Sequence, residues 1–239
     1  MQIKQPRNSG SYYFNYKSTF SIVLLALVDA NYKFIYVDVG TNGRISDGGV
    51  FRNSSLANAL QDDFLGLPAP RLMNDGESLL PYVIVADDAF PLKVNMLKPY
   101  PFRGLSKEKR IFNYRLCRAR RIVENAFGIL ANRFRVLLSP IWLSPDNVEK
   151  VTLACCVLHN FLRDKSPGTY SPPGSFDTEC PEDGTVNDGE WRQEGNESSM
   201  RSLGVLGGRN YRCDAKETRD SFCRYFNTVG SVPWQEKFV

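Results

Sequence analysis

Two apolar runs, far apart in the chain, each stop at an acidic residue. Residues 20–28 place apolar side chains in both alternating sets of positions, and Asp29 follows them. A strand that is apolar on both faces is typical of the middle of a covered sheet. Residues 82–89 contain the second run, which stops at the adjacent acids Asp87 and Asp88. The pattern therefore predicts two buried strands that each end in a carboxylate.

The segment after the first run predicts a hairpin and then a helix. Residues 34–40 have the composition of a strand and follow a short turn, so residues 20–40 are expected to form a hairpin. Ser46 or Asp47 can cap a helix over residues 50–60, because a short polar side chain at the N-cap accepts a backbone N–H. Two further segments are rich in Pro and Gly and are expected to be irregular: residues 62–81 and 91–105.

A long helix is predicted over residues 106–135. Its apolar positions recur at spacings of three and four; they are Ala119, Val123, Ala126, Phe127, Leu130 and Phe134. At ~100° per residue, Glu124 lies on the flank of this stripe rather than opposite it. The other residues on that flank are small: Cys117, Gly128 and Ala131. We expect the small residues to let another element approach the Glu124 carboxylate closely.

The last part of the chain changes character twice. A helix is expected to begin with Ser144 as its cap, followed by Pro145, and its core positions are Val148, Val151, Cys155, Leu158 and Leu162. Residues 165–208 are acidic, rich in Gly, Asn and Ser and without periodicity, which predicts a disordered linker. A short helix over residues 215–227 follows.

These elements predict an α/β fold, a mixed central sheet flanked by helices. The expected division is a main domain over residues 1–164, an acidic linker over residues 165–208 and a C-terminal helical tail over residues 209–239. With 239 residues, 42% of them hydrophobic, the chain can bury a full core.

Charge and cysteine content narrow the class of protein. The net charge of +4 permits a nucleic-acid partner without arguing for one. The six cysteines form no CxxC pair, and one histidine cannot complete a Cys/His zinc site, so we expect reduced thiols in an intracellular protein. The first residues are polar and resemble no secretory signal, and the longest apolar run is too short to span a bilayer. A soluble protein without a membrane partner is expected.

Three carboxylates are the candidate chemistry. Asp29 and Asp87 are expected at strand ends, where open α/β sheets expose ligand-binding groups, and Glu124 lies on the flank of the long helix. A single acid at a strand end is more often a turn residue. Three carboxylates without a Cys/His set suit hard ions such as Mg²⁺ or Mn²⁺, and two such ions can bind the attacking and leaving oxygens of a phosphodiester. The pattern favours a divalent-metal site.

A basic cluster precedes Glu124 in the long helix, with Glu108 as its only counter-charge. Its members are Arg103, Lys107, Lys109, Arg110, Arg115, Arg118, Arg120 and Arg121. A solvated helix face is one interpretation. Contact with DNA phosphates is the other, with Arg120 as the best candidate because it projects on the side of Glu124. His159 is interpreted as a hydrogen-bonded core histidine rather than a ligand, and the Cys155–Cys156 pair as core packing.

Several separated stretches, in order, resemble the nuclease domain of PIF/Harbinger-type transposases and host genes derived from them. The stretches are FNYKSTFSIVLLALVDANYKF, GTNGRISDGGVF, IVADDAFPLKVNMLKPYP, RARRIVENAFGILANRFRVL, ACCVLHNFL and, in the tail, RDSFCRYFNTVGSVPWQ. They cover most of residues 1–163 and the C-terminus. The resemblance implies a DDE-superfamily endonuclease with a ribonuclease H-like fold.

The resemblance also implies roles for individual residues. Asp29, Asp87 and Glu124 match the catalytic, metal-binding acids, which would hold two Mg²⁺ or Mn²⁺ ions. Asp88 competes with Asp87, since adjacent strand residues point to opposite faces. Asp47 also falls on a family motif, where capping a helix is the alternative role. Double-stranded DNA, a Myb-like DNA-binding partner and a nuclear location, with cytoplasm as a second compartment, are the further implications; a homo-oligomer is left open.

The chain departs from the family pattern at its N-terminus. Family members usually carry a helix-turn-helix region before the nuclease domain, whereas this sequence has no basic helical segment before Asp29. Two hypotheses follow: a metal-dependent DNA endonuclease or strand-transfer domain, and a domesticated non-catalytic nuclear protein that uses the fold to bind DNA or protein. Three convergent acids favour the first, and the missing N-terminal region favours the second.

Overall fold

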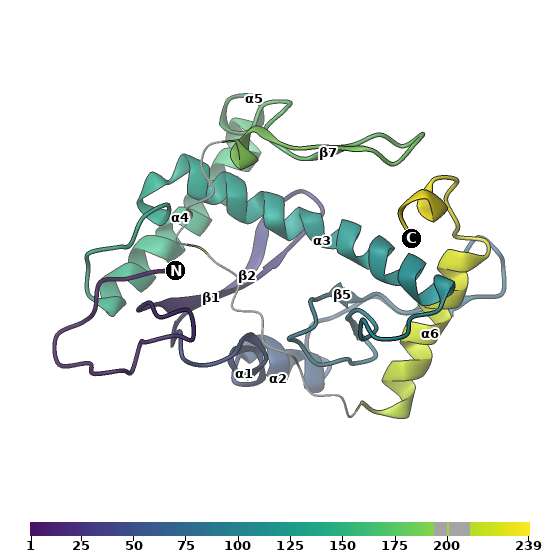
Figure 1. Cartoon of the computed structure of the whole chain (residues 1–239), viewed down its shortest axis with the longest axis horizontal. Coiled ribbons are helices and arrows are strands. Elements are labelled where there is room, and N and C mark those ends of the chain that lie inside the picture. The colour runs from purple at the N-terminus through teal and green to yellow at the C-terminus, as the bar shows by residue number, and fades with distance from the viewer. Residues whose placement is uncertain (194–199, 201–210) are drawn as a thin grey trace. The chain divides into compact units, whose positions relative to one another are not determined.

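The computed structural model describes residues 1–193, 200 and 211–239 (Figure 1). The predicted acidic linker therefore falls partly outside the described residues, at 194–199 and 201–208. The predicted α/β class is confirmed, since helices and strands both contribute to the fold. The predicted central sheet is not what the structure shows: within the described ranges the strands pair in four separate two-stranded sheets.

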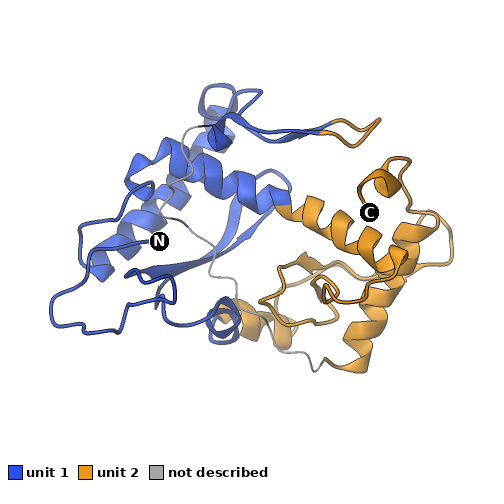
Figure 2. Cartoon of the chain, in the orientation of Figure 1, with its two compact units in different colours: residues 1–54, 121–179, 186–203 blue, residues 55–120, 180–185, 204–239 orange. Residues whose placement is uncertain are grey.

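The chain divides into two compact units, coloured separately in Figure 2. Unit 1 comprises Met1–Ser54, Arg121–Glu179 and Val186–Leu203, and unit 2 comprises Ser55–Arg120, Cys180–Thr185 and Gly204–Val239. Helix α3, Lys107–Arg133, contributes its first part to unit 2 and its last part to unit 1. The units do not follow the predicted borders at 164 and 208: both contain segments from either side of residue 164, and unit 2 contains segments from either side of residue 208.

The predicted hairpin is confirmed in unit 1. Strand β1, Ile22–Val28, pairs antiparallel with β2, Phe34–Asn42. Irregular register at both ends of β1 marks bulges in the ladder. Apolar residues on both faces of β1 agree with burial: Ile22, Val23 and Leu25 are buried in the core. Helix α4, Pro145–Lys165, packs against β2 and supplies the cover that the apolar pattern required.

The predicted helix over residues 50–60 is two helices. The first, α1, is Asp47–Arg52, and the second, α2, is Ser55–Gln61. The Ser46 hydroxyl accepts the Gly49 N–H at 3.3 Å, so Ser46 is the cap and Asp47 is the first helical residue. The break follows Asn53, because the buried Ser54 hydroxyl donates to the Phe51 carbonyl at 2.7 Å and competes with helix continuation.

Helix α4, Pro145–Lys165, begins where the sequence predicts, with Ser144 at the N-cap position. Its buried residues are Val148, Thr152, Cys155, Cys156 and His159. The predicted core position Leu158 is instead 47% exposed. The buried face is rotated toward His159 because that imidazole is hydrogen-bonded inside the core on both of its nitrogens.

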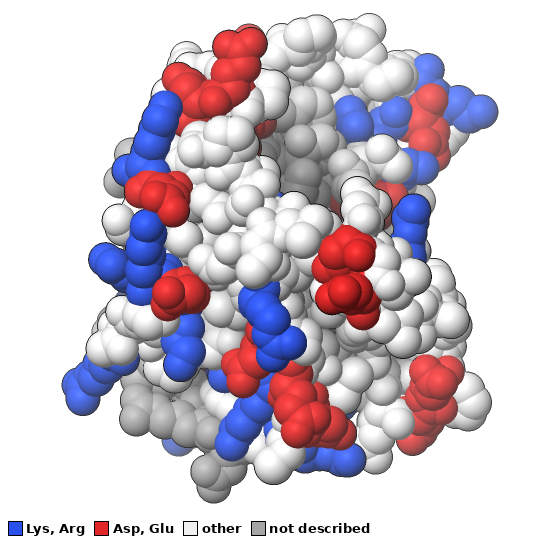
Figure 3. Space-filling model, turned by 90° about the vertical axis from the view of Figure 1, so that its right-hand side faces the viewer, with Lys and Arg blue, Asp and Glu red and all other residues white. Residues whose placement is uncertain are grey.

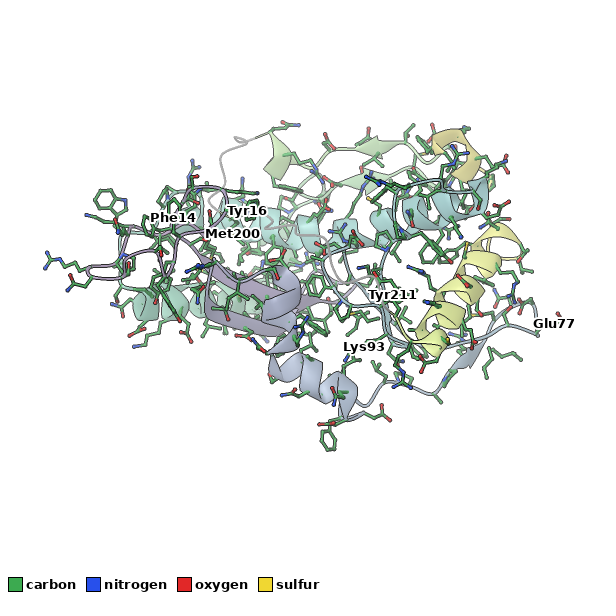
Figure 4. The ribbon with its side chains drawn as sticks, turned by 60° about the horizontal axis from the view of Figure 1, so that its bottom comes forward. Phe14, Tyr16, Glu77, Lys93, Met200 and Tyr211 are labelled. Atoms are coloured by element: carbon green, nitrogen blue, oxygen red, sulfur yellow. The ribbon has the colours of Figure 1, made fainter. Side chains whose placement is uncertain are left out.

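Unit 2 is built on short strands and the first part of α3. Strands β3, Arg71–Leu72, and β4, Leu79–Leu80, are antiparallel, while β5, Ile84–Val85, and β6, Met96–Leu97, are parallel. The strand predicted over residues 82–89 is thus shorter, and a strand occurs in the segment 91–105 that was expected to be irregular. Helix α6, Cys213–Asn227, confirms the predicted C-terminal helix. Tyr211, labelled in Figure 4, packs beside its N-terminal end on this unit's core.

Residues 165–193 are structured, which corrects the expectation of a disordered linker for this part. They contain α5, Pro167–Tyr170, the antiparallel pair β7, Thr178–Glu179, and β8, Val186–Asn187, and the 3₁₀-helix η2, Glu190–Arg192. Aromatic anchors explain the order: Phe176 stacks on Tyr32 with ring centroids 4.1 Å apart, and Trp191 packs on α3. The acidic composition concealed these anchors. Two further 3₁₀-helices, η1 and η3, are Arg135–Leu137 and Gln235–Phe238.

Candidate metal-binding carboxylates

Asp29 lies in the turn that joins β1 to β2. Its Oδ1 accepts the backbone N–H groups of Asn31 at 2.8 Å and Lys33 at 2.9 Å. The backbone closes the same turn, since Asp29 N–H donates to the Lys33 carbonyl and Tyr32 N–H to the Asp29 carbonyl, both at 3.0 Å. Both side-chain bonds of the turn go to Oδ1, so the turn fixes the direction of the half-buried carboxylate. The turn-residue interpretation of Asp29 is correct, and it is compatible with a ligand role for the second oxygen.

Asp87 and Asp88 have different surroundings, both within unit 2. Asp87 Oδ1 accepts the Ala89 N–H at 2.9 Å, and its Oδ2 lies 3.9 Å from Arg120 Nη2. Asp88 Oδ1 lies 3.1 Å from the ammonium group of Lys98, whose side chain is fully buried. Lys98 also donates to the Asp88 and Phe90 carbonyls. Asp88 thus neutralises a buried lysine, whereas Asp87 faces the long helix.

Glu124 projects from the unit 1 part of α3 toward η2. Arg192 Nη2 lies 3.5 Å from Glu124 Oε2 and 2.6 Å from Asp177 Oδ2. The same guanidinium lies 3.6 Å from Asp188 through its Nε. Burial opposes ionisation of Asp177, but the Arg192 hydrogen bond and the Gly189 N–H outweigh it and lower the pKa of Asp177. The Asp177 hydrogen bond in turn raises the pKa of Arg192, with Glu124 adding to the effect. The Arg192 guanidinium is therefore the positively charged partner of Glu124.

The small-residue flank beside Glu124 receives a neighbouring element, as the sequence predicts. The Trp191 indole covers Gly128 so closely that a Cβ at this position would overlap the ring. Trp191 Nε1 donates to Asn125 Oδ1 at 2.8 Å, and the Asp177 N–H donates to the same oxygen. The Arg192 guanidinium stacks on the Trp191 ring at 4.2 Å. Trp191 and Arg192 together form what we call the α3 cover.

The three predicted acids are divided between the two units, with Asp29 and Glu124 in unit 1 and Asp87 in unit 2. Among residues 1–193, 200 and 211–239, no group of three or more His, Cys, Asp and Glu side chains is arranged to hold a metal ion. The donor chemistry itself fits divalent cations, because carboxylate oxygens are the ligands that Mg²⁺ and Mn²⁺ prefer. Guanidinium groups lie 3.9 Å from Asp87 and 3.5 Å from Glu124, so a metal ion would compete with Arg120 and Arg192 for these carboxylates.

The basic cluster divides into structural and exposed members. Arg118 is buried, stacks 3.8 Å above the Trp234 ring and donates to Tyr114 and Gly184. Arg115 donates to the Gly230 carbonyl at 3.1 Å and to Gln235 at 3.0 Å. Both side chains hold the C-terminal segment against α3 within unit 2, which explains part of the cluster without a nucleic acid.

The exposed members remain available to solvent. Arg103 and Arg110 are exposed, and Arg120 is 24% exposed beside Asp87. On the face drawn in Figure 3, Lys and Arg alternate with Asp and Glu rather than forming one basic field. On this face, phosphate binding would depend on a few individual arginine side chains rather than on a broad positively charged surface.

His159 confirms the prediction of a hydrogen-bonded core histidine. Its Nδ1 lies 2.8 Å from the Tyr170 hydroxyl and its Nε2 2.8 Å from the Tyr32 carbonyl. A carbonyl can only accept, so Nε2 carries the proton and Nδ1 accepts from Tyr170. All six cysteines are free, as expected, and Cys155 and Cys156 are buried in the core. In the described parts of the chain, no helix has the length and apolarity needed to cross a bilayer.

Comparison with known protein families assigns the chain to a family. The family model described as "DDE superfamily endonuclease" matches residues 1–160, about two thirds of the chain. The chain belongs to this DDE endonuclease family. The predicted resemblance is thereby confirmed, and the match includes Asp29, Asp87 and Glu124. DDE superfamily endonucleases generally use divalent metals.

Individual relatives agree with the family. "Protein ALP1-like" from Arabidopsis thaliana is 29% identical over 64% of this chain and 38% of its own length. "Putative nuclease HARBI1" is 26% identical in both Mus musculus and Homo sapiens, over 72% and 75% of this chain. The chain spans less than half the length of these relatives, 46% and 48% for the two mammalian proteins. No solved structure matches the chain at a significant level.

Sequence analysis did not identify several residues that lie beside the predicted acids. Asp177 and Trp191 lie in the segment that was expected to be disordered, and Lys98 lies in one that was expected to be irregular. A signal for Arg192 was present, because it is the first basic residue within a run of acids. A lone cation among acids is a candidate for an ion-paired network rather than for disorder.

Proposed function

We propose that this chain is a divalent-metal-dependent DNA endonuclease or strand-transfer domain of a Harbinger-type transposase or of a host gene derived from one. The observation that carries the proposal is that the family match spans all three candidate acids, Asp29, Asp87 and Glu124. Carboxylate oxygens are the ligands that Mg²⁺ and Mn²⁺ prefer. Asp88 is the weaker candidate, because it already neutralises the buried Lys98 ammonium group.

Asp29, Asp87 and Glu124 would hold Mg²⁺ or Mn²⁺, with two ions as the proposed number. When bound, such ions activate the attacking water or 3′-hydroxyl and stabilise the leaving oxygen of a phosphodiester. The chain's own residues prepare this site. The turn amides of Asn31 and Lys33 orient Asp29. Arg120 and Arg192 are the counter-charges of Asp87 and Glu124 that a bound cation would replace.

The basic side chains of α3 and of the segment just before it provide a contact surface for DNA in this proposal. Arg103 and Arg110 are exposed, and Arg120 combines partial exposure with proximity to Asp87. Arginine forms bidentate contacts with phosphate and positions the backbone without reading sequence. Arg115 and Arg118 are excluded from this role because their guanidinium groups hold the C-terminal segment.

A ribonuclease H-like arrangement is part of the proposal. Its support is the order of elements and acids: Asp29 after β1, Asp87 after β5 and Glu124 on α3. In such a fold the strands that carry the first two acids are neighbours in one sheet. In the described part of the chain β1 and β5 lie in separate two-stranded sheets, so the shared sheet is the untested step of this proposal. An experimental structure of the metal-bound protein would test it, and β1 and β5 that stay in unconnected sheets when metal is bound would refute it.

The catalytic test is the conversion of supercoiled DNA to nicked circles in Mn²⁺ by the wild-type protein and Glu124→Gln. Loss of a partner that merely supports a metal ligand typically costs about 10–100-fold in activity. Loss of a ligand itself should therefore reduce nicking by at least about 100-fold. Gln keeps the size of Glu and the possibility of a contact with Arg192, so the fold should persist.

The matched control is Glu108→Gln, the same substitution in the first turn of the same helix. Glu108 is exposed and belongs to the other unit, so its variant should nick DNA at the wild-type rate. Equal activity of wild type and Glu124→Gln, with both dependent on Mn²⁺, would refute the site assignment.

A non-catalytic nuclear protein that uses the fold for DNA or protein binding is the second candidate. Arg192 favours it, because this guanidinium already satisfies Glu124 and Asp177 without any metal. This candidate predicts DNA binding by the wild-type protein without nicking in Mg²⁺ or Mn²⁺. Nicking that depends on Glu124 would exclude it.

Location and partners are proposed from the family resemblance alone. A nuclear location, with cytoplasm as a second compartment, and a Myb-like protein that supplies DNA binding would both suit a nuclease domain. A tagged full chain that stays outside the nucleus when such a partner is co-expressed would count against both. Sedimentation of the purified chain would decide between a monomer and a homo-oligomer.

A further inference from the structure

Helix α4 binds the main chain of the turn that carries Asp29. Asn160 accepts the Phe34 N–H on its Oδ1 at 2.9 Å and donates its Nδ2 to the Phe34 carbonyl at 2.8 Å. Phe34 is the first residue of β2, which pairs with β1 and with no second strand in the part of the chain that the structure describes. The Asn160 amide thus substitutes for a neighbouring strand at this position and fixes the start of β2.

His159 and Arg163 bind the turn on either side of that point. His159 Nε2 donates to the Tyr32 carbonyl at 2.8 Å. Arg163 donates to the Asn31 carbonyl from Nη2 at 3.0 Å and from Nε at 3.3 Å. Three side chains within five residues of one helix therefore bind the main chain of Asn31, Tyr32 and Phe34. Hydrogen bonds to carbonyls determine backbone position more directly than side-chain packing does.

The turn needs external support because Tyr32 is in the left-handed conformation, with φ of 63°. This region costs a non-glycine residue roughly 1–2 kcal/mol. The Tyr32 ring stacks on Phe176, and the Arg163 guanidinium lies over both rings, at 5.6 and 5.0 Å from their centroids. Strained residues that the surroundings hold in place occur preferentially at functional sites. The neighbouring functional candidate is Asp29.

We propose that His159, Asn160 and Arg163 are positioning residues, a turn clamp that fixes the β1–β2 turn and presets the Asp29 carboxylate for cation binding. The functional part of this inference rests on the proposed metal-binding role of Asp29. The clamp acts through the main chain: it holds the carbonyls of Asn31, Tyr32 and Phe34. The amides of Asn31 and Lys33 are thereby held in place to bind Asp29 Oδ1. Asp29 contacts the ion, and the clamp residues do not.

Hydrogen exchange tests the clamp without any metal. In Asn160→Ala, the Asn31 and Lys33 amides should exchange at least about tenfold faster, because they lose their fixed acceptor when the turn opens. Amides of the β1–β2 ladder, such as Leu25, should keep their protection. Asp164→Asn is the matched control: Asp164 contacts the same turn, but only through an exposed ion pair with the Lys33 side chain at 2.7 Å. It should leave exchange unchanged.

A second pair of variants keeps the test decisive if Asn160→Ala does not fold. Arg163→Met removes the two bonds to the Asn31 carbonyl and the charge over Tyr32, in a partly exposed position. Arg163→Lys keeps a donor and the charge and should restore much of the protection at Asn31 and Lys33. Unchanged exchange in a folded Asn160→Ala or Arg163→Met protein would overturn the clamp.

Mn²⁺ affinity, measured by calorimetry, tests the functional part. Asn160→Ala should bind Mn²⁺ about 10–100-fold more weakly than wild type, the effect typical of residues that orient a metal ligand. Asp164→Asn should bind like wild type. Faster exchange with unchanged Mn²⁺ affinity would overturn positioning for cation binding. Failure of the proposed function is a separate result: Asp29→Asn and wild type would bind Mn²⁺ equally, while exchange would still decide whether the clamp exists.

Discussion

Asp87 and Asp88 illustrate how neighbouring residues of the same type acquire different roles. The sequence left the choice between them open, apart from the family motif that favours Asp87. Lys98 distinguishes the two aspartates. Its fully buried ammonium group needs a carboxylate partner, and that partner is Asp88. Asp87 is left beside Arg120 on α3. The assignment of Asp87 as the metal ligand stays a prediction, which substitution of each aspartate in turn would test.

Asp87→Asn should abolish nicking with little effect on stability, because Arg120 is its only long-range ion-pair contact in the described structure and lies at 3.9 Å. Asp88→Asn should retain nicking but lose stability, by about 1–3 kcal/mol, the cost of weakening the partner of a buried charged group. Nicking assays and urea unfolding of both variants provide the measurement. The reverse pattern, with nicking lost only in Asp88→Asn, would reassign the second acid.

Side-chain partners at the residue scale were the least predictable feature of the candidate site. Asp29, Asp87 and Glu124 were found from pattern and family motif. Arg192 was not, because its pairing with Glu124 joins positions 68 residues apart and sequence periodicity carries no information over such a separation. Asp177 was not, because it pairs with Arg192 inside the segment that was expected to be disordered. The hydrogen bonds of Asn160 to Phe34 span 126 residues and were hidden for the same reason.

At the scale of elements, the contact between η2 and α3 depends on one missing side chain. Gly128 lies in the interior of a helix, where glycine is destabilising by roughly 0.5–1 kcal/mol relative to alanine. The Trp191 ring occupies the space that a Cβ would need. The loss of helix propensity at Gly128 is thus the condition under which Trp191 and Arg192, the α3 cover, can pack beside Glu124.

Gly128→Ala should therefore undock Trp191 despite the gain in helix propensity. Overpacking typically costs about 1–3 kcal/mol, which exceeds the roughly 1 kcal/mol that alanine gains in a helix. The expected result is a net loss of stability together with greater solvent exposure of the Trp191 indole. Urea unfolding measures the stability. The difference in native-state fluorescence between Gly128→Ala and wild type, to which Trp142 and Trp234 contribute equally in both proteins, measures the exposure of Trp191.

Gly168→Ala in α5 is the control for this substitution. Nothing lies within 4 Å of a Cβ at Gly168, so alanine there should be neutral or slightly stabilising. A Gly128→Ala protein that is as stable as Gly168→Ala, with unchanged fluorescence, would show that the contact tolerates a methyl group.

Element boundaries were predicted well where local chemistry determines them. Ser144 and Pro145 marked the start of α4, and the three-and-four spacing marked α3 to within two residues at each end. The α1–α2 break was missed because it depends on the hydroxyl of Ser54 bonding backward to Phe51. The order in residues 165–193 was missed because composition outweighed three aromatic anchors, Tyr170, Phe176 and Trp191.

At the scale of the whole molecule, pH couples stability to the turn clamp. Burial lowers the pKa of His159 below its ordinary value, and Arg163 adds to the effect, while the bond to the Tyr32 carbonyl opposes it. The unfolded chain then binds the proton more tightly than the folded protein. Stability from neutral His159 is complete above its ordinary pKa of about 6.5 and is lost as the pH falls toward the lowered folded value.

The wild-type protein should therefore lose unfolding free energy below about pH 6.5, by up to roughly 1.4 kcal/mol per pH unit for this one proton. His159→Gln keeps a donor for the Tyr32 carbonyl but cannot ionise, so its loss should be smaller. Urea unfolding at pH 5, 6, 7 and 8 gives the two curves. Burial also lowers the pKa of the Met1 amine to about 6, which affects both proteins equally and cancels in their difference.

Parallel curves for wild type and His159→Gln would contradict the shift assigned to His159. The interpretation is simple because the chain contains one histidine. Any difference between the two proteins near pH 6 must therefore come from this imidazole or from groups that respond to it, of which Arg163 and Tyr170 are the nearest.

Because the Trp191 ring packs directly on the main chain of Gly128, substitutions at positions 128 and 191 are expected to depend on each other during evolution. A lineage that replaces the glycine with a bulkier residue must lose or relocate the tryptophan, and a lineage that loses the tryptophan is released from the need for glycine. Comparing diverged descendants of this chain should show the two positions changing jointly. A descendant that combines tryptophan at one with a large side chain at the other would carry a different arrangement around Glu124.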